Sequence, residues 1–434
     1  MTDVVLSSLK SSSLQNSVNA VSETHPFVYQ LGESTVPVAQ ETVKISANSS
    51  VDPAGGQLVS FKLPGSGFLV DGYLRLDSTA TAAGVNNDVA GTPASGGVYS
   101  YEYLSLASRD VEIARFSPLI LEAEACKGKN TRLNQLAINA NQADLTAAQI
   151  NVTGTKPLLL PFRLMNFSAS PKDALDLQFL ESLYLNAKVK AATDIAVGFT
   201  NPSVSDLHSV LKYAKMPAES YQEYLNANYD QNKSLTKMMW SSYVESVQTV
   251  RAVTGAGNKS FNMNIDCPNY AISTVIKVIP QTCSDATKWI KAGGLSGGAR
   301  INDVKMSANG KLIVDTHGDV RSEFLGLTQT DFESDESRTD KWGAIGGVVY
   351  HTAPTNAGFY EIDYRLLNLG HESRSIDSLE GGISFGALSS KNLTVDWEHD
   401  ADFDGDYKIH VVHKVVNLVS IDARNGSCSV STRS

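Results

Sequence analysis

The stretch GFLVDGYLRLD, Gly67 to Asp77, decides the fold class, because its side chains alternate between apolar and polar. The apolar members are Phe68, Val70, Leu74 and Leu76, and the polar members are Asp71, Tyr73, Arg75 and Asp77. Successive side chains of a β-strand point to opposite faces, so this alternation is typical of a strand with one face in a core. It predicts a protein built from half-buried strands.

Similar stretches recur along the chain. They are LDLQFLESLYLNAKVK, NYAISTVIKVIP, AGFYEIDYRLL, KNLTVDWE and DYKIHVVHKVVNLVSID. In the last one, an apolar set shares one face: Ile409, Val411, Val415, Val419 and Ile421. Turn signals such as LPGSG, SANGK and APTNAG separate the stretches. Many short strands at close spacing favour a β-sandwich or barrel over a parallel α/β sheet.

One segment interrupts this pattern. MPAESYQEYLNANYDQNKS begins with Pro217 near a first helical position and continues with good helix formers. We expect a short helix over about residues 217–231. Strand-like sequence of similar length lies on both sides, which predicts two all-β domains in tandem with a helical connector.

The net charge of −10 over 434 residues is a poor match to nucleic acid, which needs a basic footprint. We therefore expect no direct, sequence-specific contact with nucleic acid. The cysteines Cys126, Cys267, Cys283 and Cys428 form no CxxC pair. Neither a zinc site nor a disulfide framework is indicated, and free thiols in a reducing cytoplasm are expected.

The N-terminal residues have no basic start and no continuous apolar run, so we expect no secretion signal, and no stretch is apolar enough for a membrane span. Residues 1–25 do carry a sparse apolar stripe at roughly helical spacing. The stripe consists of Val5, Leu9, Leu14, Val18 and Val21. Two interpretations stay open: an unstructured tail, or an arm that orders against a partner or a membrane surface.

Chemical motifs are few. No HExxH motif occurs, and the glycine-rich AGGLSGGAR, Ala292 to Arg300, lacks both the GK[ST] ending and the strand–loop–helix context of a phosphate loop, so we expect no enzyme. The candidate site is Asp400, Asp402 and Asp404, which alternate and precede Gly405. Such residues begin calcium loops, but an EF-hand would need a glutamate where Val411 stands. An acidic β-hairpin turn at Asp404-Gly405 is favoured. A looser calcium loop is the alternative, and apart from that calcium ion we expect no cofactor.

Four segments together resemble one family. They are KPLLLPFRLMNFSASPKDALDLQFLESLYLNAKVK (Lys156 to Lys190), NIDCPNYAISTVIKVIP (Asn264 to Pro280), INDVKMSANGKLI (Ile301 to Ile313), and SLEGGISFGALSSKNLTVDWE followed by DYKIHVVHKVVNLVSID. In order and spacing they are similar to the double jelly-roll major capsid proteins of tailless icosahedral viruses. Arg163 stands where large DNA viruses usually have an aromatic, which points to a distant branch, with a phage as the expected source.

The resemblance implies a fold of two tandem eight-stranded jelly rolls with a short connecting helix. It divides the chain into an N-terminal arm (1–27), a first jelly roll with the helix (28–232), a second jelly roll (233–425) and a C-terminal tail (426–434). It also implies a structural subunit that trimerises into pseudo-hexagonal capsomers of a viral shell. Its partners would be neighbouring capsomers, minor capsid or penton proteins, and an inner membrane reached by the arm.

By this resemblance the protein is made in the host cytoplasm and resides in the virion. The competing interpretation is a secreted or surface β-sandwich, such as an adhesin or carbohydrate-binding protein with a calcium loop. The lack of a secretion signal and of aromatic clusters counts against it.

Overall fold

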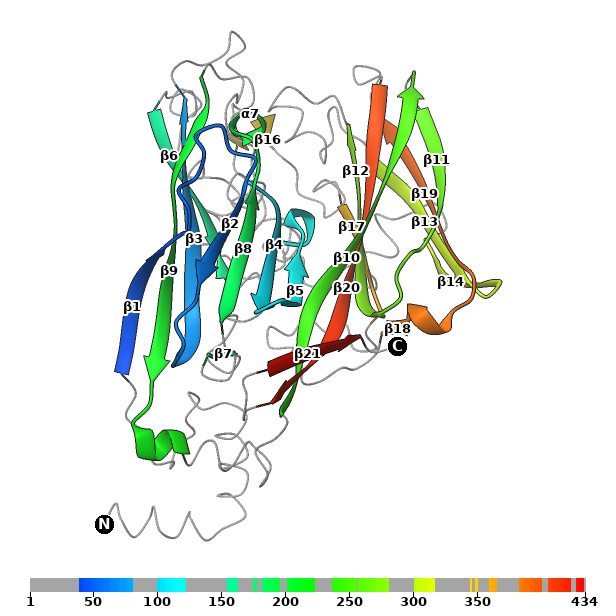
Figure 1. Ribbon diagram of the computed structural model, residues 1–434. Helices are drawn as coiled ribbons and strands as arrows, with labels where there is room; N and C mark the ends of the chain where they lie inside the picture. Colours follow the sequence, from blue (N-terminus) through cyan, green and yellow to red (C-terminus); the bar gives the residue numbers. More distant parts are fainter. Residues whose placement is uncertain are drawn as a thin grey trace, which may run out of the picture.

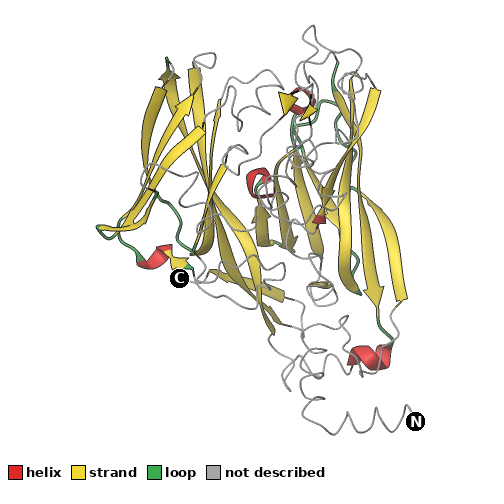
Figure 2. Cartoon of the chain, turned by 180° about the vertical axis from the view of Figure 1, so that it is seen from behind, coloured by secondary structure: helices red, strands yellow, loops and turns green. Residues whose placement is uncertain are grey.

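The computed structural model describes residues 39–80, 100–121, 154–162, 175–177, 182–195, 201–222, 236–255, 257–280, 300–316, 344–345, 348–349, 359–364, 382–399, 405–422 and 427–432. Strands dominate these ranges and form two barrels that stand side by side (Figures 1 and 2). Within them, no helix is long and apolar enough to cross a membrane.

The first barrel packs a sheet of order β1-β9-β3-β6 against a sheet of order β2-β8-β4-β5. Its strands are β1 (Ala39–Ser46), β2 (Leu58–Lys62), β3 (Phe68–Ala80), β4 (Tyr101–Ser108), β5 (Val111–Phe116), β6 (Gly154–Pro161), β8 (Leu183–Val189) and β9 (Ser203–Lys215). The short β7 (Leu175–Asp176) pairs with the start of β3, and α7 (Ala192–Ile195) follows β8. The first strand pairs with the last and the second with the next to last, which is the wrapping of a jelly roll.

The second barrel repeats this wrapping, with sheets β10-β20-β12-β17 and β11-β19-β13-β14. Its strands are β10 (Thr236–Val253), β11 (Gly257–Asn264), β12 (Tyr270–Pro280), β13 (Arg300–Ala308), β14 (Lys311–Asp315), β17 (Phe359–Asp363), β19 (Lys391–His399) and β20 (Gly405–Asp422). Smaller elements are β15 (Ala344–Ile345), β16 (Val348–Val349), β18 (Ile383–Ser384), the 3₁₀ turn η4 (Phe385–Ala387) and β21 (Ser427–Thr432). The prediction of two tandem jelly rolls is confirmed.

The two barrels share their irregularities as well as their order. β5 has an extra residue, Ile113, opposite β4, and β14 has an extra residue, Ile313, opposite β13. Likewise Val70 is extra in β3 opposite β9, and Ile272 is extra in β12 opposite β20. β-bulges change the twist of a strand and fix its register. The matching bulges therefore allow the strands of one barrel to be aligned residue by residue with the equivalent strands of the other.

The opening stretch forms β3, although its alternation is not regular throughout. Leu74 and Leu76 point into the core as predicted. The bulge at Val70 shifts the earlier residues by one, so Leu69 lies in the core cluster and Val70 is half-buried. Phe68 instead meets Tyr221 edge to face, with the ring centroids 5.9 Å apart. The expectation that Phe68 and Val70 share the inner face with Leu74 is therefore wrong.

The predicted break between the barrels contains helix. β9 ends at Lys215, residues 218–222 are helical, and β10 begins at Thr236. The amide of Tyr221 donates to the carbonyl of Pro217 at 2.9 Å, which is the first helical turn. Residues 223–231 of the predicted helix lie outside the described residues. The domain limits at 27, 232 and 425 stay a prediction.

Candidate functional site

The sequence-predicted metal residues Asp400, Asp402 and Asp404 lie outside the described residues. Their place in the chain is nevertheless fixed, because β19 ends at His399 and β20 begins at Gly405. These two strands belong to different sheets, β11-β19-β13-β14 and β10-β20-β12-β17. The predicted β-hairpin at Asp404-Gly405 is therefore wrong, since a jelly roll sends this connection across from one sheet to the other. Among the described residues, no group of three or more His, Cys, Asp or Glu side chains could hold a metal.

The described residues do form an extensive contact between the two barrels. β5 is the last strand of its sheet, and it packs against β10, β20 and β21 of the second barrel (Figure 1). An exposed strand edge presents unpaired backbone groups and is prone to unwanted pairing. How the second barrel covers this edge therefore bears directly on how such barrels associate.

Two side chains of the second barrel bind the edge of β5. The amide of Arg115 donates to Ser242 Oγ at 3.0 Å. Asn417 Nδ2 donates to the carbonyl oxygen of Ile113 at 3.2 Å. Both Ser242 and Asn417 are buried, so each bond also avoids the cost of leaving a buried backbone group unpaired. The hydroxyl of Ser242 and the amide of Asn417, on the neighbouring strands β10 and β20, thus satisfy two backbone groups at the edge of β5.

Apolar side chains surround these bonds. The rings of Phe116 in β5 and Tyr243 in β10 are 5.8 Å apart. Val275 and Val412 of the second barrel belong to the same buried cluster as the core of the first barrel. The hydrophobic core thus continues across the contact, which fixes the two barrels to each other through burial as well as hydrogen bonds.

Charged groups from both barrels meet beside this apolar zone. Burial lowers the pKa of Lys190, next to β8, to about 8, while the charges of Asp194, Glu102 and Glu245 partly oppose that shift. Glu245 lies on β10, and its Oε1 is 2.9 Å from Nδ1 of His410 on β20. Lys190 of the first barrel and Glu245 of the second therefore lie close enough for their charges to influence each other.

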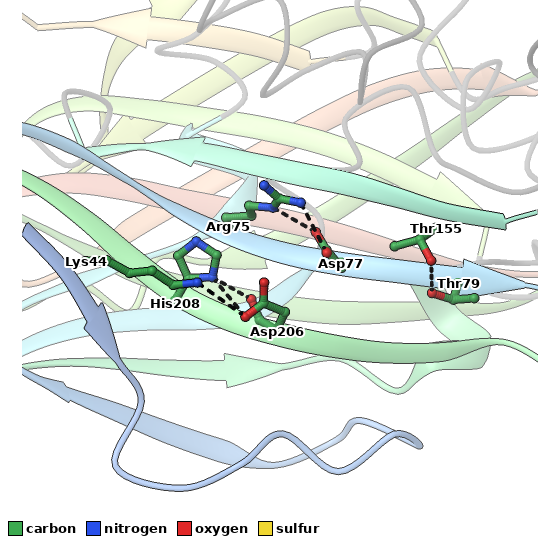
Figure 3. A network of polar contacts seen from close by, with 7 residues as sticks. All are labelled: Lys44, Arg75, Asp77, Thr79, Thr155, Asp206 and His208. Atoms are coloured by element: carbon green, nitrogen blue, oxygen red, sulfur yellow. Dashed lines mark hydrogen bonds and ion pairs between the residues drawn. The ribbon is translucent and has the colours of Figure 1, made fainter.

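The outer face of the first barrel's β1-β9-β3-β6 sheet carries a second polar network (Figure 3). Arg75 and Asp77 on β3 form a bidentate ion pair, at 2.9 and 3.2 Å, which raises the pKa of the guanidinium. Asp206 on β9 is 3.7 Å from Lys44 Nζ and 3.3 Å from His208 Nδ1. Asp206 has a φ of 48° and lies in a bulge of β9, the second bulge of the β3–β9 pairing.

Near the end of β9, on the opposite face of this sheet, Lys215 Nζ contacts Glu41 Oε2 at 3.1 Å. The hydrogen bonds of Glu41 to Tyr213 and Lys215 lower the pKa of this carboxyl group. Both partners of the ion pair are about half exposed. Thr79 and Thr155 share a hydrogen bond of 2.9 Å at the other end of the outer face (Figure 3). Lys44 and Asp206 of the outer face are about half exposed, whereas Asp77 and His208 are largely buried.

Sequence reasoning missed the contact between the barrels, yet one signal for it exists. In β20 the buried residues include both Val411 and Val412, and both Val415 and Val416. Adjacent buried positions point to opposite faces, so this strand is covered on both sides. One face packs on the core of its own barrel and the other faces the first barrel.

Three solved structures are similar to this chain along most of its length. They are the PBCV-1 VP54 protein fitted into a reconstruction of the virophage Sputnik (TM-score 0.64, 13% identity, 94% of this chain and 100% of that chain), the Faustovirus major capsid protein (TM-score 0.56, 8% identity, 91% and 92%), and the mavirus major capsid protein (TM-score 0.53, 11% identity, 94% and 93%). No protein-family profile and no curated protein matches the sequence. At these identities the likeness establishes a shared double-barrel fold.

Proposed function

We propose that this chain is the major capsid protein of an icosahedral virus, a structural subunit rather than an enzyme. The observation that carries the proposal is the agreement in fold with the Faustovirus and mavirus major capsid proteins over more than nine-tenths of the chain. The nature of the surfaces supports it. Exposed charged residues such as Lys44 and Asp206 lie on the outer face of a first-barrel sheet, where they can contact other barrels.

In the proposed role three subunits form one capsomer. Two barrels per subunit give six barrels around a threefold axis, and such a near-hexagonal tile can pave a shell together with other capsomers and penton proteins. The virion is then the site of the protein, and the host cytoplasm is where it is made. A phage as the source stays a prediction.

Sedimentation of the purified full chain tests this role, followed by electron microscopy of concentrated samples. We expect a trimer that forms flat arrays or shells under crowding conditions. A chain that stays monomeric at every concentration, salt and pH tried would contradict the proposal.

The rival adhesin interpretation finds no support among the similar structures, which are capsid proteins. Residues 1–27 lie outside the described residues, and we propose that they form an arm that orders only in the particle, against a partner or an inner membrane. Truncation at Glu23 is expected to leave a folded subunit that assembles poorly. Normal assembly of the truncated chain would refute the arm.

The acidic connection keeps its two interpretations. We propose that Asp400, Asp402 and Asp404 form an exposed acidic turn that needs no metal, because water and salt screen their mutual repulsion. Calcium binding is the alternative, and it becomes favourable where the aspartates are buried at a subunit contact. A calcium titration of the melting temperature separates the two. A rise at millimolar calcium that is absent from the Asp402→Asn, Asp404→Asn variant would establish the calcium loop.

A further inference from the structure

We propose that His413 is an acid sensor: when its ring gains a proton, residues 382–390, which cover one end of the second barrel, are released. These residues include β18 and the 3₁₀ turn η4 and lie at one end of that barrel (Figures 1 and 2). The inference goes beyond the proposed capsid function and does not depend on it, because the sensor lies within one subunit. A subunit without the sensor can still build a shell, so the two proposals fail separately.

The ring of His413 is fully buried, and only one of its nitrogens has a partner. Its Nδ1 lies 2.7 Å from Thr274 Oγ1 on β12, which lies 2.7 Å from the hydroxyl of Tyr364. That hydroxyl donates to Met306 Sδ on β13 at 3.4 Å. The chain of bonds is complete when Nδ1 donates to Thr274, Thr274 to Tyr364, and Tyr364 to Met306. Nε2 is then without a proton, and among the described residues it has no hydrogen-bond partner.

The described groups around the ring disfavour a positive charge. Burial, and after it the charge of Lys391 at the start of β19, lower the pKa of His413 to about 3. Thr274 of β12, Phe385 of η4 and the methionine of β13 are uncharged, and the titratable Tyr364 donates its proton elsewhere. A histidine in water has a pKa near 6.5. Acidification from pH 6.5 towards pH 3 therefore favours any state in which this ring reaches water.

Residues 382–390 are the part of this environment with the fewest attachments. β18 pairs with β12 over two residues only, Tyr270 and Ala271. The amide of Phe385 donates to the carbonyl of Asn269 at 3.2 Å. Lys391 Nζ donates to the carbonyl oxygen of Phe385 at 3.0 Å and to that of Cys267 at 3.1 Å. β20, which carries the sensor, is instead paired with β10 and β12 along most of its length.

Phe385 connects the sensor to this segment. Its ring is fully buried, with its centroid 5.2 Å from that of His413 and 5.8 Å from that of Tyr364. Hydration of the protonated histidine requires Phe385 to leave, which draws residues 382–390 away from β12. Lys391 repels the protonated ring and also holds the carbonyl of Phe385, so the repulsion acts on the same attachment. The release uncovers Cys267, whose side chain is fully buried in the closed barrel.

The thiol of Cys267 reports the release, because it is buried and donates to the carbonyl of Asn269 beside the segment. The parent for the test is the full chain with alanine at Cys126, Cys283 and Cys428, so that dithiodipyridine labels Cys267 alone. The labelling rate at pH 7 and at pH 5 is divided by the rate of the same chain unfolded in urea. This ratio should rise roughly 20-fold from pH 7 to pH 5, the shift in an opening equilibrium when burial lowers a histidine pKa from 6.5 to 3.

Three variants locate the effect. His413→Gln keeps a neutral polar side chain at the sensor and should abolish the pH dependence. His410→Gln, on the opposite face of the same strand, is the matched control and should be labelled like the parent. Lys391→Met loses the bonds to the carbonyls of Cys267 and Phe385 and should be labelled faster already at pH 7. Circular dichroism verifies that each variant is folded.

Hydrogen exchange of the parent separates local release from unfolding. After correction for intrinsic exchange rates, residues 382–390 should lose protection at pH 5 while β3 keeps it. Equal labelling of the parent at both pH values overturns the proposal, and so does a pH effect that survives in folded His413→Gln. Joint loss of protection in β3 means global acid unfolding and overturns the local release. If His413→Gln does not fold, Lys391→Met decides: unchanged labelling at pH 7 overturns the release.

Discussion

His413 shows how a single residue can serve the fold without serving chemistry. The ring lies in the interior of the second barrel, 2.7 Å from Thr274 Oγ1 through Nδ1 and 5.2 Å from the ring of Phe385. Burial, aided by the charge of Lys391, lowers the pKa of His413 to about 3. His410, three residues earlier, points to the opposite face and pairs with Glu245. Residues three apart on a strand point to opposite faces, so the two histidines cannot share a metal site.

The neutral ring of His413 predicts a pH dependence of stability. The imidazole of an unfolded histidine has a pKa near 6.5. Below that pH the unfolded chain is protonated at His413, whereas the folded chain is protonated there only below about pH 3. Stability that is present above pH 6.5 is therefore lost on acidification, at up to about 1.4 kcal/mol per pH unit. In His413→Gln this loss is absent, so the free-energy difference between wild type and variant should shrink from pH 7 to pH 5. Urea unfolding at several pH values measures it, with His410→Gln as control. Parallel stability curves would contradict the prediction.

Asn417 and Ser242 test the sealing of the β5 edge. Asn417→Ala leaves the carbonyl of Ile113 without its donor, and Ser242→Ala leaves the amide of Arg115 without its acceptor. Each change is expected to lower the free energy of unfolding by about 1–3 kcal/mol, because a buried backbone group becomes unpaired. Denaturant unfolding measures the loss, and Thr249→Ala on the exposed part of β10 is the control. A loss no larger than that of the control would mean that water satisfies the edge.

At the scale of elements, the strands that sequence predicted are those with strong local patterns. NYAISTVIKVIP and KNLTVDWE became β12 and β19, and the Asn-Gly turn of SANGK joins β13 to β14. The bulge at Val70 carries no local signal, because partner strands create it. β21 was missed for a related reason. Its sequence SCSVST is short and polar, and pairing with β20 makes it a strand.

The contact between the barrels could be predicted only in part. The adjacent buried valines of β20 indicate that both faces of the strand are covered, but they do not identify the element that covers the outer face. The partner is set by how two whole barrels meet, and that depends on surfaces far apart in the sequence. The same limit holds for Asp400 and its neighbours, whose hairpin interpretation failed because the jelly-roll wrapping separates β19 from β20.

β21 offers a prediction at this scale. It pairs with β20 from Asn417 to Asp422, and Cys428 and Val430 pack against the shared core. Deleting residues 427–434 should lower the free energy of unfolding by about 2–4 kcal/mol, from the apolar burial that is lost. Thermal and denaturant unfolding measure it, and deletion of residues 433–434 alone is the control. Equal stability of the two truncated chains would show that β21 contributes nothing to the contact.

At the scale of the whole molecule, one buried cluster spans both barrels. Val275 and Val412 join the core of the first barrel across the contact, while the second barrel keeps a core of its own. Contacts between domains of one chain are often small and polar, and such domains move and unfold separately. A contact with buried apolar and hydrogen-bonded groups links the two units and fixes the angle between them.

This linkage predicts that the barrels of the isolated subunit unfold together. Scanning calorimetry of the wild type at low concentration should give one transition, with equal calorimetric and van't Hoff enthalpies. Combining Tyr243→Ala with Asn417→Ala removes the ring contact with Phe116 and the bond to Ile113, and should split the transition in two. With the contact weakened, each barrel unfolds at the temperature set by its own stability. The control combines Thr249→Ala with Lys62→Glu, which leave the contact intact. Two transitions already in the wild type would show that each barrel is stable alone, and that the angle between them must be fixed by assembly.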